Sequence, residues 1–243
     1  MIDFVKCKWM LWMLFVVSST TAFSMNHRKA FGNDWQEAEQ YVEEHRAEWR
    51  ETFDVFEVDA MVAEAIVFPE LIRYSRWQDE IESAAVTALY VNGGKQQANF
   101  SIGRFQMKPS FAEELERDWN RSMLVQTYEF VFDTHDTSTA RRSRVKRLGT
   151  MLGQCRYLAI FIRLQQLRHP ELLQCSKQEQ VRRLATLYNR SYTASWQEMD
   201  SLALEKHFHT DMIKTRRTRL YSYAAIAVEY YMCVAQFSYA KRI

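Results

Sequence analysis

One stretch in the second half of the chain limits the fold more than any other. Apolar side chains recur there at alternating steps of three and four residues, namely Val145, Leu148, Leu152, Cys155, Ala159 and Ile162. This spacing places them on one face of an α-helix. The sequence therefore predicts a single long amphipathic helix over residues 141–168, which ends before Pro170.

Two scarce residue types extend this argument to the whole chain. Only 6 glycines and 3 prolines occur among 243 residues, too few for the many tight turns of a β-sandwich or barrel. Hydrophobic residues make up 47% of the chain, which supplies a core and argues against a disordered protein. We therefore predict a mainly α fold, with at most a small β element near residues 95–107. The formal net charge of +2 argues against a nucleic-acid partner.

Further helices follow from apolar periodicity and from residues that start or stop helices. The expected ranges are 34–52, capped by Asp34 and peripheral, then 58–75, 77–91, 109–119, 177–189, 196–208 and 218–237. Asn92-Gly93-Gly94 is a stop signal, and Ser176 caps the helix that ends at Asn189. Pro69 should kink the very apolar second helix or remove one backbone hydrogen bond. Residues 25–34 are expected to be a flexible leader, and 120–140 a loop with some local order.

The first 24 residues have the pattern of a signal peptide. Lys6 and Lys8 precede a nine-residue apolar core, Trp9–Val17, and Ala22-Phe23-Ser24 forms an acceptable cleavage site. This core is too short to span a bilayer of about 30 Å as a helix. The pattern predicts an exported protein, either periplasmic or associated with the cell envelope. An uncleaved N-terminal anchor is the alternative.

Cleavage at that site would leave three cysteines, Cys155, Cys175 and Cys233. Two of them could pair in an oxidising compartment, but Cys155 falls on the apolar helix face. Buried free thiols are therefore an equal expectation. The spacing shows no zinc pattern.

A single acid closes the apolar run Ala65-Ile66-Val67-Phe68-Pro69-Glu70. A carboxyl group on such a buried helix is partly desolvated, which disfavours its charged form and raises its pKa. The general acid of a glycosidase needs this property, because it must hold a proton near neutral pH. The plainer interpretation is an ion-paired or solvent-facing Glu at a helix kink.

Two later segments offer groups that could bind a sugar. In Ser101–Pro109, Gly103 allows close approach of the backbone and Gln106 offers an amide that both donates and accepts hydrogen bonds. In Leu184–Asn189, Tyr188 and Asn189 come at the end of a helix. Either segment alone is explained as well by core packing.

Taken in order, the three segments resemble the motif series of the soluble lytic transglycosylases and related lysozyme-like enzymes. That family has a catalytic Glu that closes an apolar helix, then a G-L-M-Q-like segment before a proline, then an A-Y-N-like segment. Gly103–Met107 with Pro109 is similar to the second, and Leu187-Tyr188-Asn189 to the third. The resemblance covers roughly residues 58–235. It implies a lysozyme-like helical domain over 58–243 that follows an N-terminal helical extension over 25–57.

The chain also departs from the family's pattern. Leu71 stands where the family has Ser or Thr after the acid, and Arg190-Ser191 replace a small residue and a glycine. Pro69 precedes the acid, and the stretch from Glu70 to Gly103 is longer than in common members. The resemblance therefore implies a divergent branch.

The resemblance implies cleavage of the MurNAc-GlcNAc bonds of peptidoglycan glycan strands, with Glu70 as acid and then base. Gln106, Tyr188 and Asn189 would bind sugar or orient Glu70, and Gly103 and Phe105 would line the groove. No cofactor and no metal are implied. The absence of Asp and Glu from Ser83 to Ala112 agrees with chemistry that uses one carboxyl group.

Several alternatives remain open at this level. Glu64 is the rival acid on the same helix, although its position six residues earlier points it elsewhere. A second carboxylate from distant sequence, for example Asp118 or Asp136, would instead make the protein a hydrolase. A lysozyme-like domain without activity could bind wall glycan or act as a scaffold with an envelope protein partner. An exported helical interaction protein is a third hypothesis, and the oligomeric state is not specified.

Other polar clusters are weaker candidates for sites. His207 and His209 lack further ligands at closed-site spacing, so we expect no metal. His135-Asp136 has no nucleophile-elbow glycines nearby. The basic run Arg141–Arg147 is expected to be a solvated helix face or a contact to acidic wall polymer or membrane surface. Aromatic side chains could stack on sugars, although most are expected in the core: Phe53, Phe56, Trp77, Trp119 and Trp196.

Overall fold

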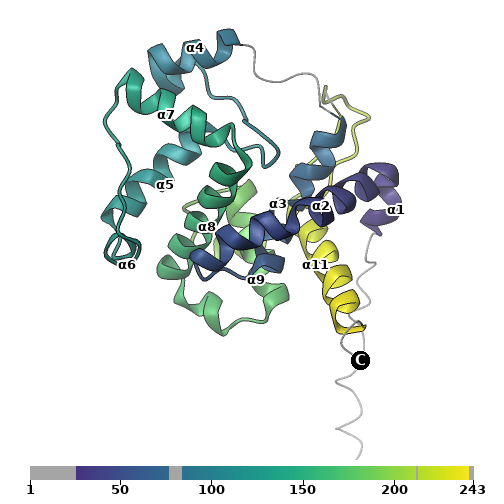
Figure 1. Ribbon diagram of the computed structural model, residues 1–243. Helices are drawn as coiled ribbons and strands as arrows, with labels where there is room; N and C mark the ends of the chain where they lie inside the picture. Colours follow the sequence, from purple (N-terminus) through teal and green to yellow (C-terminus); the bar gives the residue numbers. More distant parts are fainter. Residues whose placement is uncertain (1–25, 77–83, 212, 241–243) are drawn as a thin grey trace, which may run out of the picture.

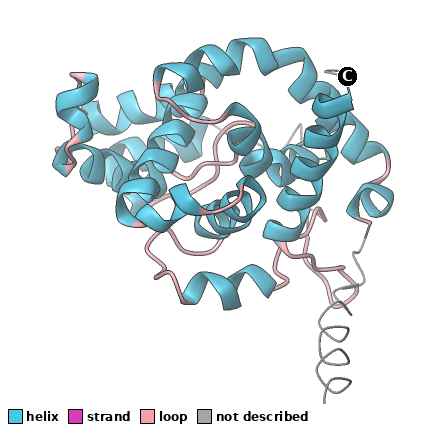
Figure 2. Ribbon diagram, turned by 90° about the horizontal axis from the view of Figure 1, so that it is seen from below, coloured by secondary structure: helices cyan, strands magenta, loops and turns pink. Residues whose placement is uncertain are grey.

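A computed structural model describes residues 26–76, 84–211 and 213–240 of this protein. Helices joined by loops make up most of this part (Figures 1 and 2), so the predicted mainly α fold is confirmed. Its β pairing is confined, within the described ranges, to two isolated bridges, Ile102–Met107 and Phe208–Tyr221. The first lies where the sequence predicts a small β element. The predicted signal peptide and Trp77 lie outside the described residues.

The described α-helices follow one another with short 3₁₀ turns at Gly94–Gln96 and Pro170–Gln174. In chain order they are α1 (His27–Phe31), α2 (Asn33–Val55), α3 (Ala60–Arg76), α4 (Ala84–Gly93), α5 (Pro109–Arg121), α6 (Leu124–Tyr128), α7 (Ser138–Leu148), α8 (Met151–Arg168), α9 (Lys177–Asn189), α10 (Glu198–Leu204) and α11 (Tyr223–Ala240). None of them is long and apolar enough to cross a membrane.

Helix α3 lies at the centre of the fold. Every residue from Val62 to Ile72 is buried, because α2, α8, α9 and α11 pack around this helix (Figure 1). A helix that is hydrophobic on all sides has to be enclosed in this way. Helices α4, α5, α6 and α7 gather at the other side of α8 (Figure 1).

The helical backbone of α3 continues across Pro69. Proline has no N–H to donate, so one hydrogen bond of the helix is missing at this point, as the sequence predicts. One turn before Glu70, the carbonyl oxygen of Ile66 accepts a hydrogen bond of 2.9 Å from the hydroxyl of Tyr223 on α11. This bond ties α11 to the part of α3 where the backbone is weakened.

The N-terminal part differs from the expectation. Residues expected to form a flexible leader include α1, which begins at an Asn26 cap, and the side chain of Asn26 accepts a hydrogen bond from the Lys29 N–H. Helix α2 is not peripheral, because Trp35, Trp49 and Phe53 are fully buried against α3 and α8. Three of the buried apolar positions of α2 are large aromatic residues, which bury more area than their number suggests. The boundary at 57/58 stays a prediction.

The single helix predicted over residues 141–168 is wrong, because it is divided into α7 and α8. The Thr150 hydroxyl accepts a hydrogen bond of 3.2 Å from the Gly153 N–H, which caps a new helix. A Cβ at Gly153 would lie 1.9 Å from the Arg147 carbonyl oxygen, so the close approach of the two helices requires glycine. The break turns Leu152 away from the core and leaves it exposed.

Helices α5 and α9 begin where the sequence predicts, at Pro109 and after the Ser176 cap. Helix α10 is shorter than expected, and α11 begins at Tyr223 instead of near Thr218. A short helix, α6, lies in the expected loop. The three described cysteines, Cys155, Cys175 and Cys233, are free thiols.

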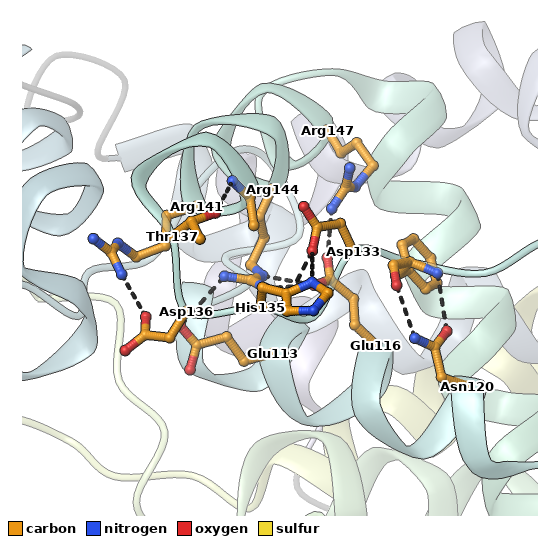
Figure 3. Close-up of polar contacts among 12 residues, drawn as sticks. Glu113, Glu116, Asn120, Asp133, His135, Asp136, Thr137, Arg141, Arg144 and Arg147 are labelled. Atoms are coloured by element: carbon orange, nitrogen blue, oxygen red, sulfur yellow. Dashed lines mark hydrogen bonds and ion pairs between the residues drawn. The ribbon is translucent and has the colours of Figure 1, made fainter.

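A buried carboxylate joins the helices on the far side of α8. Glu116 on α5 is fully buried and lies between Arg144 and Arg147 of α7 (Figure 3). Its oxygens accept hydrogen bonds from Arg144 Nε at 2.8 Å, from Arg144 Nη2 at 2.6 Å and from Arg147 Nη2 at 2.7 Å. Tyr157 on α8 also donates to it. The contacts among α5, α7 and α8 therefore depend on the buried charge of Glu116 and its partners.

The basic run Arg141–Arg147 is consequently not a solvated helix face. Arg141 is buried, and it donates from Nε to the Val91 carbonyl at 2.8 Å and from Nη2 to the Asn92 carbonyl at 3.1 Å. These carbonyls lie at the C-terminal end of α4, where a cation is favoured. Arg144 is enclosed as well, and only side chains such as Arg142 and Lys146 are exposed.

Replacing Glu116 with Gln should destabilise the protein by about 3 kcal/mol, because it takes the carboxylate from the buried guanidinium of Arg144 and the half-buried one of Arg147. Thermal unfolding followed by circular dichroism measures the loss. Glu114→Gln on the same helix is the matched control, since Glu114 is only half-buried and makes no ion pair with another described residue. Equal melting temperatures for the two variants would contradict this account of the α5–α7 contact.

Candidate functional site

A cleft of about 330 Å³ opens beside the C-terminal half of α3. Its walls come from α3, from the loop before α5, from α5 itself and from the end of α9. Four residues predicted from three separate segments of the sequence line it together: Glu70, Gln106, Tyr188 and Asn189. The fold thus brings into one place groups that lie more than a hundred residues apart in the chain.

Glu70 has the burial that its apolar helix predicts, with 5% of the residue exposed. Desolvation raises the pKa of its carboxyl group, while the positive charges of Arg73 and Lys108 act in the opposite direction. Its Oε2 lies 3.1 Å from Arg73 Nη1 but makes no hydrogen bond of good geometry within the described part of the chain. This carboxyl oxygen is therefore buried, lines the cleft and has capacity to bond a ligand.

Arg73 connects Glu70 to the loop that follows α10. Its Nε donates a hydrogen bond of 3.2 Å to the His209 carbonyl, and its guanidinium lies 4.5 Å from the centre of the Phe208 ring. Arg73 lies one helical turn after Glu70, so its position depends on both α3 and this loop. The loop consequently helps to fix the cation that faces the candidate acid.

Two phenols lie close to the carboxyl group of Glu70. Burial raises the pKa of Tyr188 and of Tyr223 far above the usual value, and the charge of Glu70 adds to the increase in both. Both hydroxyls are therefore neutral donors at ordinary pH. That of Tyr188 donates to the Phe105 carbonyl at 2.6 Å, which fixes the end of α9 to the loop before α5.

Gly103 and Phe105 do not line the cleft, in contrast to the expectation. Phe105 is fully buried and packs against Trp49, with ring centres 5.2 Å apart. Its N–H donates to Gln154 Oε1 at 2.8 Å. Gly103 has a φ of +68°, and a Cβ there would lie 2.1 Å from the Gln154 amide nitrogen. Both residues shape the loop from behind, because Gln154 occupies the space beside the glycine.

Gln106 follows directly in this loop, with a φ of +52°, which is unusual for a residue with a side chain. Its N–H and its Nε2 each donate to the Gly103 carbonyl at 3.0 Å. These two bonds hold the amide at the edge of the cleft. Backbone strain of this kind often occurs at functional sites.

A second acid, Glu114, lines the same cleft and was missed by the sequence reasoning. It lies four residues after Ser110 on α5, so both face the cleft from one side of the helix. The signal was present, because Pro109 predicts the start of this helix. Of the suggested second acids, Asp118 accepts hydrogen bonds from Arg168 and Tyr192, and Asp136 pairs with Arg141 at a different hollow.

Glu64, the rival acid, lies away from the cleft. It is fully buried, and both of its oxygens accept hydrogen bonds of 3.1 Å from Arg46 Nε on α2. Desolvation raises the pKa of Glu64 to about 7, although Arg46 counteracts the increase. This carboxylate links α2 to α3 and does not face the space that a substrate would occupy.

The remaining candidates have structural partners. His207 pairs with Glu205, and no group of three or more potential metal ligands is found among the described residues. His135 hydrogen-bonds to Asp133. Phe53, Phe56 and Trp119 are buried in the core, whereas Trp196 is partly exposed beneath the guanidinium of Arg183.

Comparison of the chain with protein-family models, with curated proteins and with solved structures gives no match.

Gly103→Ala should lower the melting temperature more than Gly32→Ala does. Both glycines have positive φ values, of +68° and +55°, so each alanine variant has backbone strain. Only the Cβ at position 103 meets another side chain, because nothing lies within 4 Å of the one at Gly32. Equal shifts in thermal unfolding would show that Gln154 moves aside without cost.

The Glu70→Gln variant should be more stable than the wild type, by a difference that grows as the pH rises. The folded state holds the Glu70 proton more tightly than the unfolded state, so wild-type stability falls as pH rises above the ordinary Glu value of about 4.5. The amide has no proton to lose. Melting temperatures of both proteins at pH 4.5, 6 and 8 measure the effect, and a constant difference across this range would show that Glu70 has an ordinary pKa.

Proposed function

We propose that this protein is a peptidoglycan lytic transglycosylase of lysozyme-like type, with Glu70 as its acid and base. The main support is the convergence of Glu70, Gln106, Tyr188 and Asn189 on one cleft. The sequence resemblance relates each of these residues to a motif of that enzyme class.

Glu70 supplies the proton in the first step. Its raised pKa favours the protonated form, which donates to the oxygen of the MurNAc-GlcNAc bond. The bond between that oxygen and C1 then breaks, and GlcNAc leaves with the new hydroxyl hydrogen. The N-acetyl group of MurNAc supports the positive charge that develops at C1.

The second step uses the carboxylate that remains. Glu70 takes the proton of the C6 hydroxyl while that oxygen forms a bond to C1, which closes a 1,6-anhydro ring. The carboxyl group thereby recovers its proton, and no water or metal takes part. The Arg73 guanidinium, 3.1 Å from Glu70 Oε2, stabilises the carboxylate between the two steps.

The other cleft residues position the sugar. The Gln106 amide and Asn189 offer donors and acceptors to hydroxyl and acetamido groups. Tyr188 keeps the walls together through its bond to the Phe105 carbonyl. Phe111 adds an aromatic face that also lines the cleft.

Glu114 favours a second candidate function, hydrolysis. A glycosidase with two carboxyl groups across its substrate can use one as acid and the other as base or nucleophile. Glu114 is half-buried and lines the cleft that holds Glu70. This candidate predicts products with reducing ends in place of anhydro sugars.

The Glu70–Arg73 ion pair favours the non-catalytic alternative, in which the domain binds wall glycan. A cation beside the carboxyl group counteracts the increase of its pKa by burial, and this opposes its use as an acid. This alternative predicts that sacculi bind equally well to the wild type and to Glu70→Gln, and that neither protein releases fragments.

Purified sacculi incubated with the wild type, Glu70→Gln and Glu114→Gln test these proposals by mass spectrometry of the released muropeptides. We expect anhydro-muramoyl products from the wild type, a decrease of at least a hundredfold in Glu70→Gln, and near-normal release from Glu114→Gln.

If the wild type releases reducing-end products and Glu114→Gln does not, the reaction is hydrolysis and not ring closure. The absence of any release, beside a control enzyme that works, would leave only binding. Glu64→Gln serves as the matched control, because this acid is buried on the same helix but lies outside the cleft.

A further inference from the structure

A second hollow, of about 400 Å³, lies against α5. We name it the α5 pocket. Polar and charged groups from the end of α4, from α5, from the loop before α7 and from α7 form its walls. Those that matter here are Gly94, Lys95, Glu113, Arg117, His135 and Arg144. Figure 3 shows Glu113, His135 and Arg144 gathered at this place.

The α5 pocket and the cleft lie along the same side of α5. Ser110 and Glu114 line the cleft, whereas Glu113 and Arg117 line the pocket. Residues separated by three, four and seven positions form one stripe on a helix. Seven residues extend over about 10 Å of a helix axis, roughly the length of a disaccharide. A ligand held in the cleft thus has the α5 pocket within reach of its side groups.

The acidic wall of the pocket is already neutralised. Glu113 accepts hydrogen bonds from the Tyr90 hydroxyl at 2.9 Å and from Arg144 Nη1 at 3.3 Å. Lys95 Nζ lies 3.5 Å from its other oxygen. Asp136, the second acid at the pocket, is mostly exposed and pairs with Arg141. Neither carboxylate leaves uncompensated negative charge in the hollow.

Arg117 supplies a cation that neutralises neither of these two carboxylates. It is half-buried, lines the pocket, and makes no hydrogen bond or ion pair with another residue in the described ranges. Arg144, by contrast, is held by Glu116 and Tyr90, and its charge is already compensated. Lys95 is paired with Glu113, so among the described residues that line the pocket Arg117 is the cation without a carboxylate partner. A guanidinium binds a carboxylate through two parallel hydrogen bonds.

We infer that the α5 pocket binds a carboxylate-bearing group, namely an acidic peptide attached to the glycan held in the cleft. The inference rests on the proposed function for the glycan, but the charges of the pocket support the carboxylate part independently. Arg117 forms the principal contact with the carboxylate and Lys95 a second one. The protein therefore distinguishes glycan that bears acidic peptides from bare glycan.

Isothermal titration of the full chain tests this with three probes. These are an N-acetylglucosamine tetrasaccharide, a muramoyl disaccharide bearing an acidic tripeptide, and the same tripeptide alone. Arg117→Gln should weaken binding of the peptide-bearing disaccharide about tenfold and leave the tetrasaccharide unchanged. Arg121→Gln is the matched control, because this exposed arginine lies on the same helix but outside the pocket. Lys95→Gln should give a smaller loss in the same direction.

The outcomes separate this inference from the proposed function, because binding needs no chemistry. Unchanged affinity of Arg117→Gln for both peptide-containing probes overturns the pocket, even if the wild type cleaves sacculi. If binding depends on Arg117 but the protein releases no fragments, the carboxylate-binding pocket is supported and the proposed enzymatic function is contradicted. If the attached peptide binds no more tightly than the free one, the link between pocket and cleft is wrong and the ligand is a free peptide.

Discussion

The enclosure of α3 is the constraint on which the rest of the structure depends. Because every residue from Val62 to Ile72 is buried, the surrounding helices must cover all sides of it. Two carboxyl groups are carried into the interior with this helix, and they meet opposite conditions. Glu64 receives a guanidinium from α2 with good geometry, whereas Glu70 keeps one oxygen without a hydrogen bond inside the described region. The same burial thus produces a structural link on one face and a candidate acid on the other.

The helices on the two sides of α8 are held together by different kinds of contact. Around α3 the contacts are mostly apolar and aromatic, as between Phe68 and Tyr230, whose ring centres are 3.7 Å apart. Between α5 and α7 the central contact is instead Glu116 with its two arginines. A buried ion pair adds little net stability compared with apolar packing, but it tolerates few alternative arrangements. Such a network suits a region that must hold polar walls beside an open pocket.

The sequence predicts some parts of the fold well, namely those that depend on one residue or on a short run of residues. Pro109 and Ser176 mark the beginnings of α5 and α9 because each meets the needs of a helix terminus. The burial of Glu70 follows from the apolar run before it. The division at Gly149-Thr150 was missed because apolar steps of three and four continue across the break. The central position of α2 was missed because a few large aromatic residues suffice to bury it.

The candidate site shows a similar division. Glu70, Gln106, Tyr188 and Asn189 were identified from motifs, and they line one cleft. Glu114 was missed because it follows the motif by a full helical turn, and only the rotation of α5 about its axis decides which way it faces. Phe105 was placed in the groove because the family resemblance implies that its position lines the groove. The structure uses it as core beneath Trp49 instead.

The bond between the Tyr188 hydroxyl and the Phe105 carbonyl has a consequence for the order in which the protein is made. The two residues that it joins are separated by 83 positions in the chain. Glu70, which lines the same cleft, comes before both of them in the sequence. During synthesis the ribosome therefore produces Glu70 long before the residues that enclose it. The growing chain holds an apolar segment with a carboxyl group that has no cleft around it. Only when α9 has emerged and docked against α3 does that carboxyl group acquire this wall of the cleft, so the cleft forms late in the synthesis of the chain.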